Sequence, residues 1–174
     1  MKTNIFAVVG SKSSGKTKTI EVLTEELTKR GYRVAAVKHI PEPNFTMDRE
    51  GKDTWRFAQA GAKTIVSVAS REIATIEKTD ESNISLEEIV QRCSDSDVVL
   101  LEGFRKLVGK NKDVPKIVTV KSSEEALDAS KTFQPILAFM SFYPIGILDL
   151  NIPYMNMLED KEKIADMVEK DVEK

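Results

Sequence analysis

Short runs of mostly apolar residues alternate along the chain with segments in which apolar residues recur every three or four positions. Runs of four or five such residues are typical of buried strands. They lie at 5–9, 34–37, 65–69, 73–76, 98–101, 117–120 and 136–139. The alternation of strand and helix patterns predicts an α/β fold, a three-layer sandwich built on a mostly parallel sheet.

Two of these runs are too close together for a helical crossover. Residues 65–69 and 73–76 are separated by a short connection that contains Ser70 and Arg71. Parallel neighbours need a crossover of a dozen or more residues, so we expect an antiparallel hairpin here. We place this hairpin on one edge of the sheet, which would make the sheet mixed.

The first helix is predicted directly after the first strand. Ile20, Leu23 and Leu27 recur at three- and four-residue spacing among charged residues. This pattern predicts a helix from about residue 16 to about Arg30, and Gly31 supplies the stop.

Two further helices and one irregular segment are expected. Ser85 and Glu88 have the spacing of a capping box, which predicts a helix over 86–92. Residues 159–174 are highly charged but keep an apolar face, so we expect an amphipathic terminal helix. Residues 143–155 contain two prolines and a glycine, and we expect them to be irregular.

The connection between the first strand and the first helix carries the main chemical signal. Residues 10–17 read GSKSSGKT and fit the pattern G-x-x-x-x-G-K-[ST]. Gly10 and Gly15 can adopt torsions that turn successive backbone N–H groups toward phosphate oxygens. Lys16 would place a positive charge against the terminal phosphates, and Thr17 would offer its hydroxyl to Mg²⁺.

The motif predicts a phosphate-binding loop (P-loop), and with it a P-loop NTPase sandwich. The alternative is a Gly/Ser-rich turn that merely joins a strand to a helix. We favour nucleotide binding because strand, loop and helix follow in the required order. The predicted nucleotide-binding residues are Gly10, Ser11, Lys12, Ser13, Ser14, Gly15, Lys16, Thr17 and Lys18.

A second motif ends the run 98–101. Glu102 follows four apolar residues and precedes Gly103, where a P-loop protein places a carboxylate that holds the water shell of Mg²⁺. The alternative is an acidic residue that simply ends a buried strand. With Thr17, Glu102 completes the predicted Mg²⁺ site.

Composition and charge narrow the class of protein. The 174 residues suit one nucleotide-binding domain over 1–174, and a net charge of -2 argues against a nucleic-acid partner. Cys93 is the only cysteine, which is compatible with a reducing compartment. The apolar run 5–9 is too short for a signal peptide or a membrane span. We therefore expect a cytoplasmic protein with no membrane partner.

Several motifs together resemble the molybdopterin-guanine dinucleotide biosynthesis protein B family. These are the P-loop, Lys38-His39, Asp48, GKDTWR at 51–56, AGA at 60–62, LLEGF at 100–104 and PKI at 115–117. The resemblance covers roughly residues 4 to 120. It implies a P-loop α/β fold that binds GTP with Mg²⁺, hydrolyses it weakly and forms a homodimer. It also implies assistance to the guanylyltransferase that attaches GMP to molybdopterin, with direct binding of molybdopterin left open.

The resemblance also assigns roles to residues outside the P-loop. Lys38, His39, Lys52 and Arg56 would contact a substrate phosphate or the dimer partner. Asp48 would orient water or the metal shell, as carboxylates do in related nucleotide hydrolases. The alternative for Asp48 is an ordinary loop aspartate. The predicted catalytic residues are Lys16, Asp48 and Glu102, with Asp48 as a further candidate for Mg²⁺.

The chain departs from the family pattern at two places. Pro41, Glu42 and Pro43 follow His39 where family members often carry more histidines, so His39 is the only histidine. Lys18 stands where members commonly have a second threonine, which alters the expected contact to the α-phosphate.

Two local questions stay open at this level. Asp53 either takes part in catalysis or caps the amino end of a helix. The usual guanine-reading motif N-K-x-D is absent, because Asn111-Lys112-Asp113 lacks the spacer. In an open α/β sheet a base could be met at the carboxyl ends of two strands, near Lys121 and Ser141, and this expectation rests on geometry without a motif.

Three functions compete. The first is an accessory GTPase of molybdenum or tungsten cofactor maturation. The second is a small-molecule kinase, which would close Arg71, Arg92 or Arg105 over the transferred phosphate. The third is an adaptor that binds nucleotide without useful hydrolysis and changes its grip on the transferase.

Overall fold

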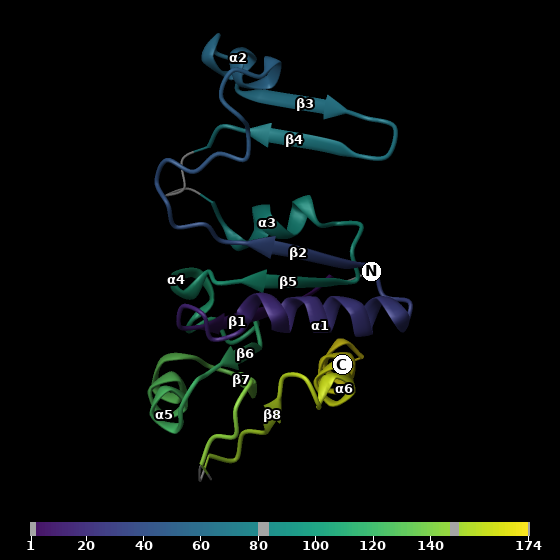
Figure 1. Cartoon of the computed structure of the whole chain (residues 1–174). Coiled ribbons are helices and arrows are strands. Elements are labelled where there is room, and N and C mark those ends of the chain that lie inside the picture. Colours follow the sequence, from purple (N-terminus) through teal and green to yellow (C-terminus); the bar gives the residue numbers. More distant parts are fainter. Residues whose placement is uncertain (1–2, 80–83, 147–149, 174) are drawn as a thin grey trace. The chain divides into compact units, whose positions relative to one another are not determined.

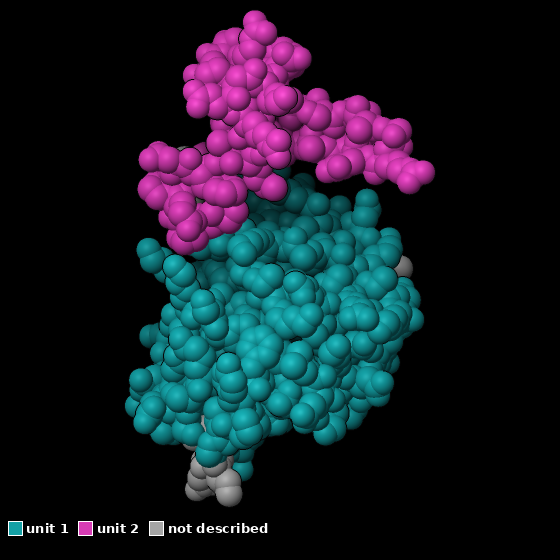
Figure 2. All heavy atoms as spheres, in the orientation of Figure 1, with its two compact units in different colours: residues 1–39, 86–174 teal, residues 40–85 magenta. Residues whose placement is uncertain are grey.

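The computed structural model describes residues 3–79, 84–146 and 150–173, and the chain divides into two compact units. The larger unit comprises Met1–His39 and Leu86–Lys174, and the smaller comprises Ile40–Ser85 (Figure 2). The prediction of one nucleotide-binding domain over 1–174 stays a prediction.

The larger unit is built on a six-stranded sheet with the order β2-β5-β1-β6-β7-β8 (Figure 1). Every neighbouring pair in this sheet is parallel. The inner strand β5 is buried along its whole length, as expected where helices cover both faces of a parallel sheet. The strands are β1 (Asn4–Gly10), β2 (Val34–Lys38), β5 (Val98–Glu102), β6 (Lys116–Thr119), β7 (Ile136–Ser141) and β8 (Tyr154–Asn156).

Helices cover both faces of this sheet. One core cluster contains Leu23 and Leu27 of α1 with Ile164 and Val168 of α6, and the other contains residues of α3, α4 and α5. The three-layer α/β sandwich with a mostly parallel sheet is therefore confirmed. The helices of this unit are α1 (Lys16–Lys29), α3 (Leu86–Arg92), α4 (Arg105–Val108), α5 (Ser123–Thr132) and α6 (Lys161–Val172).

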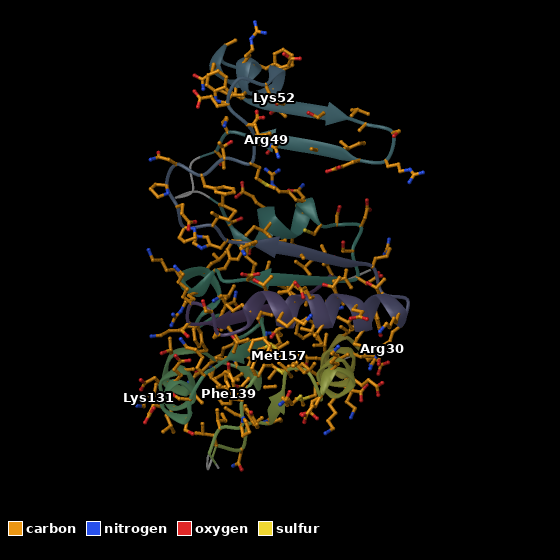
Figure 3. All side chains as sticks on the ribbon, in the orientation of Figure 1. Arg30, Arg49, Lys52, Lys131, Phe139 and Met157 are labelled. Atoms are coloured by element: carbon orange, nitrogen blue, oxygen red, sulfur yellow. The ribbon has the colours of Figure 1, made fainter. Side chains whose placement is uncertain are left out.

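The predicted helix bounds agree with the structure. The last helical residue of α1 is Lys29, Arg30 caps its carboxyl end, and Gly31 follows with a φ of 92°. Arg30 also forms ion pairs of 2.7 Å with Asp166 and 2.8 Å with Glu169, which join α1 to α6 (Figure 3). The helix over 86–92 is confirmed, and α6 confirms the amphipathic terminal helix, of which residue 174 lies outside the described part.

The smaller unit contains α2 (Asp53–Gln59) and the antiparallel pair β3 (Thr64–Val68) and β4 (Ile73–Glu77). The hairpin is confirmed, but its placement on the edge of the main sheet is wrong. Among the described residues, its strands pair only with each other, as a separate two-stranded sheet. A short connection determines which two strands pair, and it carries no information about a third strand beside them.

Two other expectations need correction. Residues 143–155 are not irregular throughout, because β8 begins at Tyr154 and pairs with β7; residues 147–149 lie outside the described part. A strand of three residues is too short to show an alternating pattern. Asp53 is the first residue of α2 and not its cap, since Lys52 occupies the capping position without a side-chain hydrogen bond.

The helix α5 was not predicted, although a local signal was available. Ser122 caps this helix by accepting a hydrogen bond of 3.3 Å from the backbone N–H of Glu125. The segment Ser122-Ser123-Glu124-Glu125 thus has the spacing that identified α3. Only Ala126, Leu127 and Ala129 are apolar over 123–132, so the apolar face of this helix is short.

Candidate nucleotide-binding site

The predicted P-loop joins the end of β1 to the start of α1. Gly10 ends the strand, Lys16 begins the helix, and Gly15 occupies the capping position before it. Ser13 and Gly15 have positive φ values of 59° and 104°, so the backbone reverses its curvature between strand and helix. Consecutive residues with this alternation form concave surfaces lined by N–H groups, which bind anions.

The first limb of the loop packs against the end of β6. A Cβ atom on Gly10 would lie 2.3 Å from the carbonyl oxygen and 2.2 Å from Oγ1 of Thr119. The Ser14 hydroxyl lies 2.6 Å from Thr119 Oγ1 and donates a 2.8 Å hydrogen bond to the carbonyl of Ser11. Only glycine allows the close approach of the two backbones at Gly10.

The second limb of the loop packs against the ends of β7 and β8. A Cβ atom on Gly15 would lie 2.5 Å from Cε of Met157 and 2.9 Å from a ring carbon of Phe142. Met157 is fully buried next to the sheet (Figure 3). Contacts with three strands therefore hold the loop.

Thr17 and Glu102 meet in the structure, as the two motifs predict. The Thr17 hydroxyl lies 3.2 Å and 3.1 Å from the two carboxylate oxygens of Glu102. Parallel register between β1 and β5 places Glu102 level with Val8, two residues before the loop begins. The Glu102 side chain is largely buried, so it faces the loop and not bulk water.

These two side chains fit Mg²⁺. Hydroxyl and carboxylate oxygens are its preferred ligands, and this ion usually keeps several waters and takes one or two protein groups together with phosphate oxygens. The described residues contain no group of three or more His, Cys, Asp or Glu side chains that would form an all-protein metal cage. The arrangement thus suits an ion shared with a phosphate ligand.

The Lys16 ammonium group lies across the loop. Its Nζ donates hydrogen bonds of 2.6 Å to the carbonyl of Ser11 and 3.3 Å to that of Gly10. Burial lowers the pKa of Lys16, and the negative charge of Glu102 opposes this effect. A desolvated ammonium group whose hydrogen bonds go to neutral carbonyls favours a nearby anion.

The surroundings of Lys16 carry further positive charge. Three other cations lower its pKa in addition to burial: Arg105, Lys38 and Lys121. Although the whole chain is slightly acidic, these three cations and Lys16 itself gather positive charge around the loop. Such a cluster of cations can offset part of the charge of a phosphate chain.

Ser11 and Lys12 of the loop are hydrogen-bonded to the segment between β6 and α5. Ser11 Oγ donates to the Glu125 carboxylate at 3.1 Å and 3.3 Å, and this carboxylate also accepts from the backbone N–H of Lys121 at 2.9 Å. Lys121 Nζ donates back to the carbonyl of Lys12 at 3.3 Å. Glu125 and Thr119 could not be predicted as loop contacts, because no local sequence pattern links them to residues more than 100 positions earlier.

A pocket of about 170 Å³ opens beside Gly10 and Ser11 of the loop. Arg105 lies in its wall, with the guanidinium carbon 5.2 Å from the centre of the Phe133 ring. The residues that line the pocket are Gly10, Ser11, Arg105, Val118, Thr119, Val120, Glu125, Asp128, Ala129, Thr132 and Phe133. Of the three arginines considered for a kinase lid, Arg105 is thus near the loop.

The pair Lys38-His39 ends the strand next to Glu102. Parallel register between β2 and β5 places Lys38 level with Glu102, and Lys38 Nζ lies 3.2 Å from Glu102 Oε1. The His39 ring packs against Phe104, with ring centres 5.2 Å apart. Lys38, assigned to the site by resemblance alone, is therefore brought to the predicted metal-binding carboxylate.

Three predicted site residues belong to the smaller unit. Asp48 accepts hydrogen bonds of 2.7 Å from the Thr54 hydroxyl and 2.9 Å from the backbone N–H of Arg49. Lys52 lies beside α2, and Arg56 pairs weakly with Asp53 at 3.8 Å (Figure 3). Their roles toward phosphate, metal or a partner stay predictions.

The fold and this loop define an α/β P-loop NTPase architecture. The family model for molybdopterin guanine dinucleotide synthesis protein B matches residues 5–141, and the chain belongs to this family. The resemblance seen in the sequence motifs is confirmed. The family is one of adapter proteins in molybdopterin-guanine dinucleotide biosynthesis.

Individual relatives agree with this assignment. The molybdopterin-guanine dinucleotide biosynthesis adapter protein of Haemophilus influenzae is 31% identical over 172 residues, which cover 95% of this chain and 87% of the relative. A crystal structure of molybdopterin-guanine biosynthesis protein B is 30% identical, with a TM-score of 0.74 over 98% of this chain and 99% of that one. The Bacillus subtilis MobB structure has a TM-score of 0.75 at 23% identity, over 96% of both chains, and supports the fold.

The helices over 3–79, 84–146 and 150–173 include no candidate membrane span. None of them combines the length and the apolar character that crossing a bilayer requires. The cytoplasmic location stays a prediction.

Proposed function

We propose that this chain is a GTP-binding accessory protein of molybdenum or tungsten cofactor biosynthesis, with weak Mg²⁺-dependent GTPase activity, that assists guanylyl transfer to molybdopterin. Membership of the adapter family supports the pathway. The observation that carries the nucleotide part is the pairing of Thr17 with Glu102 at 3.1 Å beside the P-loop.

In this proposal the loop amides and Lys16 bind the phosphates of GTP. Thr17 and Glu102 would hold Mg²⁺, which neutralises charge on the phosphate oxygens when it is bound. Asp48 would help to orient the attacking water. We expect slow turnover by the isolated chain, because efficient phosphate transfer usually requires an additional arginine from a partner.

Calorimetric titration tests the nucleotide preference. GTP and ATP are titrated separately into the protein with Mg²⁺, and we expect GTP to bind more tightly. A tenfold preference for ATP, equal to about 1.4 kcal/mol, would contradict the proposal. So would the absence of heat with both nucleotides at millimolar concentration.

Two alternatives are separated by activity and by partner binding. A small-molecule kinase would consume nucleotide faster when its acceptor is added, whereas the accessory GTPase would release phosphate at an acceptor-independent rate. A purely nucleotide-gated adaptor would bind the guanylyltransferase differently with GTP, GDP or no nucleotide, yet release no phosphate. Phosphate release and co-precipitation with the purified transferase therefore distinguish the three.

The expected homodimer draws support from the hairpin. Val66, Val68 and Ile73 share one face, since Val66 and Val68 are two residues apart and Val68 is paired with Ile73. These side chains are 54%, 76% and 69% exposed. A two-stranded hairpin is marginally stable in water when its apolar face is uncovered. We propose that a second copy of the chain covers this face.

Val68→Lys tests the homodimer, because an ammonium would be buried on this face. We expect the mass from light scattering to fall from twice 19.5 kDa toward 19.5 kDa. Ser67→Lys is the matched control, since Ser67 is exposed on the opposite face of the same strand. An unchanged dimer in Val68→Lys would contradict this interface.

A further inference from the structure

The backbone around Lys38 is fixed next to Glu102. Parallel pairing holds the two residues level, and the backbone N–H of His39 donates a 3.0 Å hydrogen bond to the carbonyl of Glu102. The His39 ring then packs on Phe104 beyond the end of β5. Lys38 therefore starts from a defined position at the carboxyl edge of the sheet.

The Lys38 side chain itself is free to change partner. It is 57% exposed, whereas the Glu102 side chain is only 12% exposed. An ion pair with such an exposed lysine contributes little net stability, so exchanging its partner costs little. Lysine also carries its charge on a flexible stem and binds phosphate as a point charge.

In the structure, Lys38 and Thr17 both contact the carboxylate of Glu102, which is proposed to hold Mg²⁺. Lys38 Nζ lies 3.2 Å from Oε1 of Glu102, and the Thr17 hydroxyl lies within 3.2 Å of both oxygens. A divalent ion at Glu102 would repel the ammonium group. Thr17 and Glu102 would hold this ion together with phosphate groups of the nucleotide, so a displaced ammonium group would have a phosphate to pair with.

We propose that Lys38 is a terminal-phosphate-binding residue: its ammonium group pairs with Glu102 until Mg²⁺ and a nucleoside triphosphate enter, and then pairs with the terminal phosphate. This inference rests on the proposed function. Lys38 thereby neutralises Glu102 before binding, when an unpaired carboxylate would repel an incoming triphosphate. After binding, its positive charge contacts the third phosphate, which a nucleoside diphosphate lacks.

The test compares GTP with GDP. In Lys38→Met, we expect affinity for GTP in Mg²⁺ to fall about tenfold through loss of a charge-assisted hydrogen bond, while affinity for GDP changes less than about twofold. In EDTA, Lys38 would stay on Glu102, so the loss of GTP preference in the variant should be clearly smaller than in Mg²⁺ and should reflect only the repulsion from the unpaired Glu102. Lys38→Arg, which keeps the charge, should restore most of the preference for GTP.

Lys29→Met is the matched control. Lys29 is 59% exposed and also pairs with glutamates, Glu25 at 2.9 Å and Glu26 at 3.0 Å, but it lies at the carboxyl end of α1. Its replacement should leave both affinities unchanged. Dissociation constants from titrations with fluorescent GTP and GDP analogues provide the measurement.

The outcomes separate this inference from the proposed function. If Lys38→Met weakens GTP and GDP equally in Mg²⁺, Lys38 stays the counter-ion of Glu102 and the inference is wrong, while the nucleotide site stands. If wild-type protein binds neither nucleotide, both the site and the inference fail.

Discussion

Replacing Gly10 by alanine is expected to lower the free energy of unfolding by about 2–3 kcal/mol, because the added methyl group overlaps the backbone of β6. The new Cβ atom would lie 2.3 Å from the Thr119 carbonyl oxygen and 2.7 Å from the Ser14 hydroxyl. The first contact involves backbone, which cannot rotate away. For a chain of this size, the melting temperature should fall by roughly 4–12 °C in thermal denaturation.

Gly31→Ala is the control for this variant. Gly31 also lies next to an end of α1, but a Cβ atom there would meet nothing within 4 Å. Its positive φ of 92° alone should cost about 1 kcal/mol in alanine. If Gly10→Ala were no less stable than Gly31→Ala, the close approach of loop and β6 would be contradicted. Gly10→Ala should also bind nucleotide poorly, since the loop must move to admit the methyl group.

The parts of the site that are local in sequence could be predicted from it. The strand, loop and helix that hold Gly10, Lys16 and Thr17 are consecutive in the chain. Apolar runs bounded by glycines identify them. Glu102 was also identified, because a carboxylate that ends a buried strand has a known position beside a P-loop. Parallel pairing of β1 with β5 then brings it to Thr17.

The parts that depend on strand order could not be predicted. Thr119 and Glu125 support the loop because β6 lies next to β1, and the sequence does not specify which strands are neighbours. The ion pair between Lys38 and Glu102 depends likewise on β2 lying beside β5. The hairpin shows the same limit, since its internal pairing followed from spacing whereas its separation from the main sheet did not.

Lys16→Ala is expected to weaken nucleotide affinity by roughly 1.5 to 3 kcal/mol, or about 10- to 150-fold, through loss of charge-assisted hydrogen bonds to phosphate. The stability of the nucleotide-free protein should change by less than about 1 kcal/mol. Two opposite effects partly cancel in this variant. It loses two stabilising hydrogen bonds to the carbonyls of Gly10 and Ser11, but it is also relieved of the cost of burying the ammonium group, which lowers the pKa of Lys16. Calorimetry and thermal denaturation measure the two quantities separately.

The two variants should differ in how stability and nucleotide affinity change. Gly10→Ala should reduce stability and binding together, whereas Lys16→Ala should reduce binding alone, because the ammonium group acts on the ligand and not on the fold. Lys29→Ala, at the opposite end of α1, should change neither affinity nor the structure of the loop. If Lys16→Ala bound GTP as tightly as wild type, the phosphates would have to lie outside the loop, and the proposed roles of Thr17 and Glu102 would fail with it.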